Sequence, residues 1–354
     1  MCGNGDPCPW EIWLTCPHFE LRVQMAVSPS VIDQLPDDAM ATRTSSFVAP
    51  TSTIADAVLV RRLSLLLSHL VVALVALVAI GGATRVMEAG LACPDWPLCY
   101  GVLLPGREMN LQVFLEWFHR LDAFVVGVAL LVLAGVAVWK RSVLPVWFSL
   151  AAVAALLLVA GQGALGALTV TQLLAAPMVT AHLGTALLLV ALLSAAQQGL
   201  QPAPVAAGPL PIWWRGLAVV ALVAAFGQCL LGGAMASQWA ADRCLAAGEG
   251  CRWLALHRGF ATPAALVVAA AALGSFLVPR GHHLVRGFGL SALLLVACQI
   301  VLGVATLRLQ LQVPLVTVGH QIVAALLVAV LAAAAAVSES GVADSCSPQE
   351  VAHG

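Results

Sequence analysis

Eight long apolar stretches constrain this sequence more than any other feature, because each is long enough to cross a lipid bilayer. A transmembrane helix needs about 20 mostly apolar residues. The stretches cover residues 63–82, 119–139, 145–168, 179–197, 215–238, 255–278, 286–307 and 316–337. Only 9% of the residues are charged, whereas soluble domains carry about 25%. We therefore exclude a soluble enzyme and predict an all-α polytopic membrane protein with eight transmembrane helices.

Basic residues gather between alternate apolar stretches, on the side that the positive-inside rule assigns to the cytoplasm. They are Arg61, Arg62, Lys140, Arg141, Arg215, Arg280 and Arg286. We expect a plasma-membrane protein with both termini in the cytoplasm, including a disordered tail over residues 1–58 and a C-terminal tail over 339–354. The formal net charge of −1 indicates no surface for nucleic acid.

Four histidines reveal an internal repeat. His119 and His257 are 138 residues apart, and so are His182 and His320. An arginine follows the first histidine of each half. The chain therefore reads as two tandem four-helix bundles, 59–200 and 201–338, related by a pseudo-two-fold repeat.

These histidines lie near the ends of the even-numbered helices, toward the outer face. A lone histidine there is best explained as an interfacial residue, but two equally spaced pairs are not. Histidine is costly inside a membrane and usually faces the bundle interior. Zinc or copper prefers three or four clustered ligands, whereas each half offers two imidazoles. We therefore predict one bis-histidine haem site per half, formed by His119 with His182 and by His257 with His320.

The two halves differ beside the first histidine. Glu116 lies three residues before His119, on the same helix face, and Leu254 stands at the matching position before His257. One interpretation is a reactive haem in the first half and an electron-transferring haem in the second. The other is that Glu116 only pairs with Arg120 or orients His119.

Two further residue sets have more than one explanation. Arg120 and Arg258 follow ligand histidines and could bind haem propionates or anchor the helices at the interface. Two close cysteine pairs, Cys93 with Cys99 and Cys244 with Cys251, lie in the loops expected on the outer face. In that oxidising environment each pair is expected to form a disulfide, which is either structural or redox-active.

Three segments and the histidines together resemble the haem A synthases. The segments are Gly-Gly-Ala-Thr-Arg (81–85), Gly-Leu-Ala-Cys-Pro-Asp-Trp-Pro-Leu-Cys (90–99) and Glu-Trp-Phe-His-Arg (116–120). The resemblance covers about residues 60–338, and the cysteine pairs are similar to those of the bacterial type. The tail at 1–58 is not part of the family pattern.

The resemblance implies an oxidoreductase that converts haem O to haem A. It implies that two successive hydroxylations turn the methyl at ring position 8 into a geminal diol, which loses water to leave a formyl group. Haem O would bind at His119 and His182, a haem b cofactor at His257 and His320, and Glu116 would be the catalytic carboxylate. The implied partners are haem O synthase, an unidentified electron donor and, for the product, terminal oxidases.

Other functions remain open at this point. A di-haem b-type electron-transfer cytochrome would explain the histidines and the repeat, but not the asymmetric Glu116. A haem exporter or chaperone is a third possibility. A haem O synthase is disfavoured, because the sequence has no Asp-rich magnesium motif.

Overall fold

The computed structural model describes residues 12–16, 19–23, 51–201, 209–237 and 251–337. Within these residues, eight helices are long and apolar enough to cross a membrane, which confirms the predicted all-α membrane fold. They are α1 (Thr51–Val86), α2 (Leu111–Trp139), α3 (Val146–Thr171), α4 (Ala176–Gly199), α5 (Ile212–Ala236), α7 (Arg252–Gly274), α8 (His283–Arg308) and α9 (Pro314–Ala335).

Two helices begin earlier than the hydropathy of the sequence suggests. α1 begins at Thr51, inside the segment expected to be a tail. α2 begins at Leu111 rather than near 119, because the Asn110 side chain accepts a hydrogen bond from Val113 N at 3.0 Å and caps the helix. The second correction matters for the site, since it places Glu116 and His119 within a regular helix.

The segment before the membrane region forms a separate unit, Met1–Ile54. Strands β1 (Ile12–Cys16) and β2 (Phe19–Val23) form an antiparallel hairpin in it, with Ile12 opposite Val23. Most of residues 1–58 and all of 339–354 lie outside the described residues, so the disordered tails stay a prediction.

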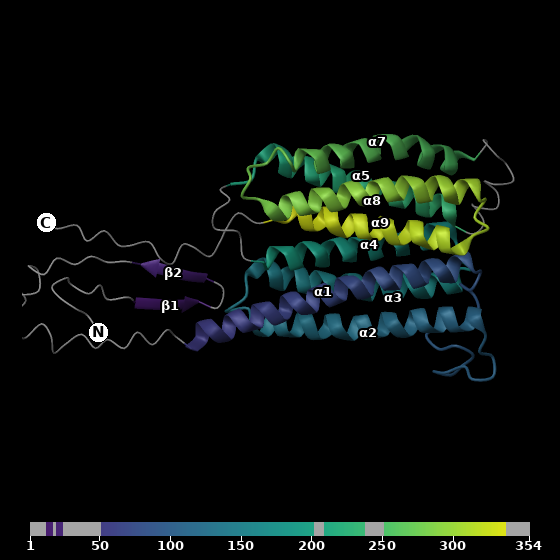
Figure 1. Cartoon of the computed structure of the whole chain (residues 1–354). Helices are drawn as coiled ribbons and strands as arrows, with labels where there is room; N and C mark the ends of the chain where they lie inside the picture. Colours follow the sequence, from purple (N-terminus) through teal and green to yellow (C-terminus); the bar gives the residue numbers. More distant parts are fainter. Residues whose placement is uncertain (1–11, 17–18, 24–50, 202–208, 238–250, 338–354) are drawn as a thin grey trace, which may run out of the picture. The chain divides into compact units, whose positions relative to one another are not determined.

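The eight helices lie side by side in one compact unit (Figure 1). For description, α1 to α4 are called the first group, or first half, and α5, α7, α8 and α9 the second. The largest buried cluster joins α1, α2, α3 and α4 with Ala325 and Ala329 of α9, and includes Leu67, Leu130 and Phe148. A second cluster joins α5, α7, α8 and α9 around Ala221 and Val268. α4 packs against α9 and α5, and so connects the groups. The proposed pseudo-two-fold relation stays a prediction.

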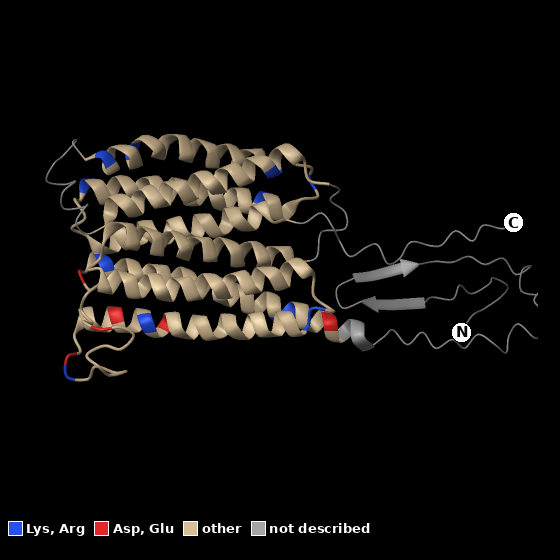
Figure 2. Cartoon of the chain, turned by 180° about the vertical axis from the view of Figure 1, so that it is seen from behind, with Lys and Arg blue, Asp and Glu red and all other residues tan. Residues whose placement is uncertain are grey.

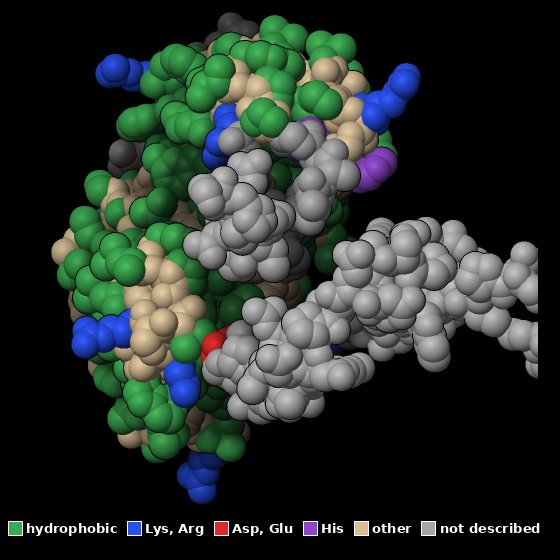
Figure 3. Space-filling view, turned by 90° about the vertical axis from the view of Figure 1, so that its left-hand side faces the viewer, with side chains coloured by type: hydrophobic (Ala, Val, Ile, Leu, Met, Phe, Trp, Pro, Cys, Tyr) green, Lys and Arg blue, Asp and Glu red, His purple; other side chains and the backbone are tan. Residues whose placement is uncertain are grey.

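Charges and apolar side chains are distributed as a bilayer requires. Lys, Arg, Asp and Glu colour the two ends of the helical bundle, and the middle is almost free of them (Figure 2). Seen end-on, the end at which α1 starts carries Lys and Arg side chains that extend outward (Figure 3). The apolar side chains of Phe124 and Leu157 are 69% and 68% exposed, which suits contact with lipid. The backbone polar groups of these helices are satisfied within each helix, as a bilayer requires.

Candidate functional site

A cavity of about 1060 Å³ lies within the first group of helices. Its walls come from α1, the loop 87–110, α2, α3 and α4, and are mostly apolar. The polar residues of the wall include Glu116, His119, Arg120 and His182. The structure therefore brings the candidate residues of the first half together in one pocket.

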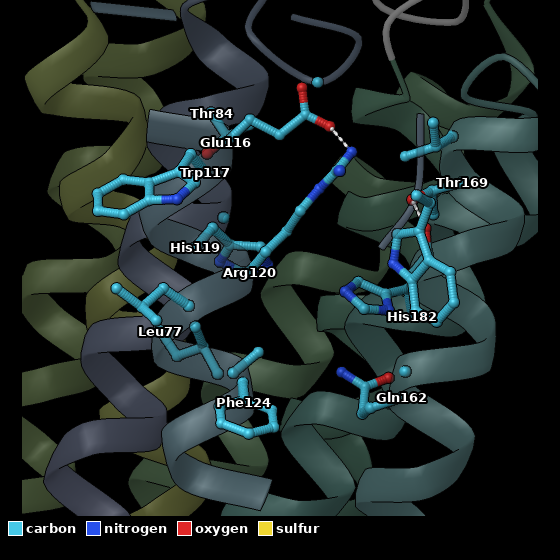
Figure 4. A pocket seen from close by; sticks show the side chains of 18 of the residues that line it. Leu77, Thr84, Glu116, Trp117, His119, Arg120, Phe124, Gln162, Thr169 and His182 are labelled. Carbon is cyan, nitrogen blue, oxygen red and sulfur yellow. Dashed lines mark hydrogen bonds and ion pairs between the residues drawn. The ribbon is translucent and has the colours of Figure 1, made fainter. Parts of the chain in front are cut away.

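His119 of α2 and His182 of α4 point into this cavity (Figure 4). Their ring centroids are 6.4 Å apart and the rings are inclined at 70°. Two imidazoles on opposite sides of a metal, each nitrogen about 2 Å from it, have centroids roughly 6 Å apart. The Nδ1 atoms of both rings are buried without a hydrogen-bond partner among the described residues. His119 and His182 are therefore the residues that would hold the iron of a haem in this cavity.

A glycine on the preceding helix lies against each of the four histidines. A methyl group built on Gly81 would lie 2.9 Å from His119 Cε1, and one on Gly166 would lie 3.5 Å from His182 Cε1. In the second half the corresponding distances are 3.0 Å for Gly232 to His257 and 3.0 Å for Gly303 to His320. These glycines let each imidazole lie close to the neighbouring backbone.

Glutamines contact the imidazoles of the second half. Gln228 Nε2 lies 3.0 Å from His257 Nδ1 and donates to the His257 carbonyl oxygen at 2.7 Å. Gln299 Nε2 lies 3.3 Å from His320 Nε2. Each glutamine precedes the glycine of its helix by four residues. In the first half, Gln162 stands four residues before Gly166 and lines the cavity together with His182. The residue four before Gly81 is Leu77, so only His119 has no equivalent amide. Side chains of this kind orient metal-binding histidines.

Glu116 is 4% exposed and holds the loop that follows α1. Its Oε2 accepts a hydrogen bond from Cys93 N at 2.8 Å, and its Oε1 pairs with Arg120 Nη2 at 2.6 Å. The pairing with Arg120 that the sequence left open is therefore present. It leaves the carboxylate at the wall of the cavity, one turn from His119.

Arg120 also holds this loop. Its guanidinium donates to the carbonyl oxygens of Asp95 at 2.6 Å, of Leu98, and of Cys93 at 3.5 Å. The structure thus gives Arg120 the loop as its partner, whereas the sequence had left a haem propionate and an anchor at the interface as alternatives; binding to a propionate stays a prediction. Arg258, its counterpart in the second half, is exposed.

The first cysteine pair closes the loop, because Cys93 and Cys99 form a disulfide and both are buried. Asp95 accepts hydrogen bonds from the backbone N–H groups of Tyr100 and Gly101 at 2.6 and 2.8 Å. Cys251 is disulfide-bonded, and its expected partner Cys244 lies outside the described residues.

The sequence analysis missed one residue that connects the halves. Gln321 follows His320 on α9, yet it lines the cavity of the first half. A methyl group on Gly82 would collide with its side-chain oxygen. In the second half, a methyl group on Gly233 would lie 3.0 Å from Leu183 Cδ2, and Leu183 follows His182. The signal in the sequence was the Gly-Gly pair, whose second glycine faces the other half.

Known proteins resemble this chain over the same region. Residues 63–332 match the cytochrome oxidase assembly protein family. A haem A synthase of Shewanella oneidensis is 34% identical over 192 residues, which are 48% of this chain and 55% of that protein. A haem A synthase of Sphingopyxis alaskensis is 31% identical over 315 residues, which are 73% of this chain and 86% of that protein. The chain therefore belongs to the haem A synthase family of cytochrome oxidase assembly proteins.

Proposed function

We propose that this protein is a haem A synthase that oxidises the C8 methyl group of haem O to a formyl group. The observation that carries the proposal is the pair His119 and His182, whose ring centroids are 6.4 Å apart in a large cavity. The buried Glu116 lies one helical turn from His119. The second half has a histidine pair but Leu254 in place of the carboxylate. The similarity to proteins described as haem A synthases supports this function over the di-haem cytochrome.

The cavity suits a substrate with a long isoprenoid chain. Phe124 and Leu121 of α2 line it, and they are 69% and 42% exposed on the surface that faces lipid. A farnesyl chain placed beside such residues stays in surroundings as apolar as the lipid tails of the bilayer. We infer that haem O enters from the bilayer between helices, with its chain in this apolar opening.

The residues of the first half have distinct roles in this proposal. His119 and His182 hold the substrate haem at its iron. Glu116 lies beside His119, where it would accept or donate a proton during the two hydroxylations and the loss of water from the diol. The oxygen atoms and the oxidant for the two hydroxylations come from outside this chain. Arg120 fixes the Glu116 carboxylate through their 2.6 Å contact and holds the loop that covers this part of the cavity.

The second half is proposed to hold haem b between His257 and His320. This cofactor would supply electron transfer to the first half. The buried Nδ1 of His320, which has no hydrogen-bond partner among the described residues, and the glycines packed against both rings suit such a ligand pair. Both sites are proposed to lie toward the outer face of the plasma membrane. Haem O synthase and an unidentified electron donor are the proposed partners.

Expression in a host that makes haem O but no haem A tests this function. The haems are extracted from purified protein and from membranes, and are separated by chromatography. We expect haem A, or its hydroxymethyl intermediate, only when the protein is present. Haem b with unreacted haem O alone, in a host where a known haem A synthase produces haem A, would contradict the proposal.

A further inference from the structure

Arg85, in the last turn of α1, has no anionic partner among the described residues. It lines the cavity of the first half, and its Nη2 is buried with no hydrogen-bond partner in the described part of the chain. No described carboxylate lies within ion-pair distance of it. Glu116 is engaged by Arg120 and Cys93 N, and the side chain of Glu88 is exposed.

Arg85 is half-buried, and its buried Nη2 belongs to a guanidinium that does not become neutral by losing its proton, because arginine stays charged in proteins. Burial of an isolated charge is strongly unfavourable unless a counter-charge compensates it. A cation that faces a ligand cavity therefore indicates that the ligand brings a negative charge. Arginine is suited to this role because its N–H groups can bind a carboxylate in a bidentate manner.

The two halves also differ in sequence at the position of Arg85. It stands three residues after Gly82, and the residue three after Gly233 is Ala236. Arg120 and Arg258, the other arginines considered as partners of a carboxylate, have different surroundings. Arg120 donates to three loop carbonyls and to Glu116, and Arg258 is exposed.

We propose that Arg85 binds a propionate carboxylate of the haem in the first-half cavity and so determines how the substrate is oriented there. This inference rests on the proposed function, since it takes haem O to be the ligand. Arg85 would be a positioning residue that fixes one edge of the macrocycle. His119 and His182 would hold its centre, and the methyl group to be oxidised would then have a fixed place relative to Glu116.

The test compares haem O with its dimethyl ester, in which both propionates are neutral. Protein that carries its second-half haem is purified from a host without haem O, and each ligand is titrated while the Soret absorbance is recorded. We expect wild-type protein to bind haem O about 10-fold to 100-fold more tightly than the ester, as for a hydrogen bond to a charged group. In Arg85→Gln this preference should fall to less than 3-fold, and Arg85→Lys should keep part of it.

Arg141→Gln is the matched control, because it removes one exposed positive charge outside the cavity and should keep the full preference. The haem content of the second half reports whether each variant is folded. Equal binding of haem O and its ester by wild-type protein would overturn the inference without any variant. An unchanged preference in Arg85→Gln would overturn it as well. If wild-type protein bound neither ligand in the first half, the proposed function itself would fail.

Discussion

The two four-helix groups hold their histidines in the same way but surround them differently. In both, a glycine on the preceding helix lies against each imidazole. The first group adds the buried carboxylate of Glu116 and a large cavity. The second adds Gln228, whose amide lies at His257 and has no counterpart beside His119. Under the proposed function, the same helical arrangement would retain a cofactor in one half and transform a substrate in the other, and the residues around the histidines would decide which.

The largest effect is expected from Glu116→Ala. Loss of a general acid or base typically lowers the rate by a factor of 10² to 10⁴, so haem A should become almost undetectable in extracts while haem b content stays normal. Glu116→Gln is the control for structure, because its amide oxygen can still accept from Cys93 N. A Glu116→Gln variant with normal haem A output would show that Glu116 serves only to hold the loop.

The next largest effect is expected on haem binding in the variants Gly81→Ala and Gly232→Ala. The added methyl groups would lie 2.9 Å from His119 Cε1 and 3.0 Å from His257 Cε1, so each displaces one imidazole. Such overpacking costs about 1–3 kcal/mol, or roughly 5-fold to 150-fold in haem affinity. Gly81→Ala should weaken haem O binding alone, and Gly232→Ala should weaken haem b retention alone. If both variants lost the same haem, the assignment of one haem to each half would be wrong.

A smaller effect is expected from Cys93→Ser. The disulfide closes a short loop, which by chain entropy stabilises the folded state by about 2 kcal/mol. The variant should have a lower Tm in detergent, and its haem A output should fall because Glu116 loses an ordered partner at Cys93 N. Its haem b content should not change. A loss of haem b equal to the loss of haem A would indicate that the loop supports both halves.

The smallest effect is expected from Gln228→Leu. This change removes the donor to the His257 carbonyl and the contact with its Nδ1, which are worth about 1 kcal/mol. Haem b should dissociate roughly 5-fold faster in a transfer assay to apomyoglobin. Leu77→Gln is the reciprocal change, and it should slow the loss of haem O from the first half. An unchanged rate in both variants would show that the amides do not account for the difference between the halves.

The sequence predicted the eight membrane helices because their length and hydropathy depend only on local composition. It also predicted the histidine pair His119 and His182, whose 6.4 Å separation the structure shows. It did not predict that Arg120 binds the loop, because those carbonyls come together only when residues 93–98 fold over α2. Gln321 was missed for a similar reason, since it reaches the first cavity from a helix of the other half. The capped start of α2 depends on a single hydrogen bond of Asn110, which hydropathy does not register.

The assignment of a separate haem to each half is tested most directly by the haem content of the double variant His119→Ala/His182→Ala. The variant and the wild-type protein are purified from a host that makes haem O but no haem A, and the extracted haems are quantified per protein. The account predicts that the variant keeps the wild-type amount of haem b and contains neither haem O nor haem A. A variant that lost haem b, or that still produced haem A, would contradict it.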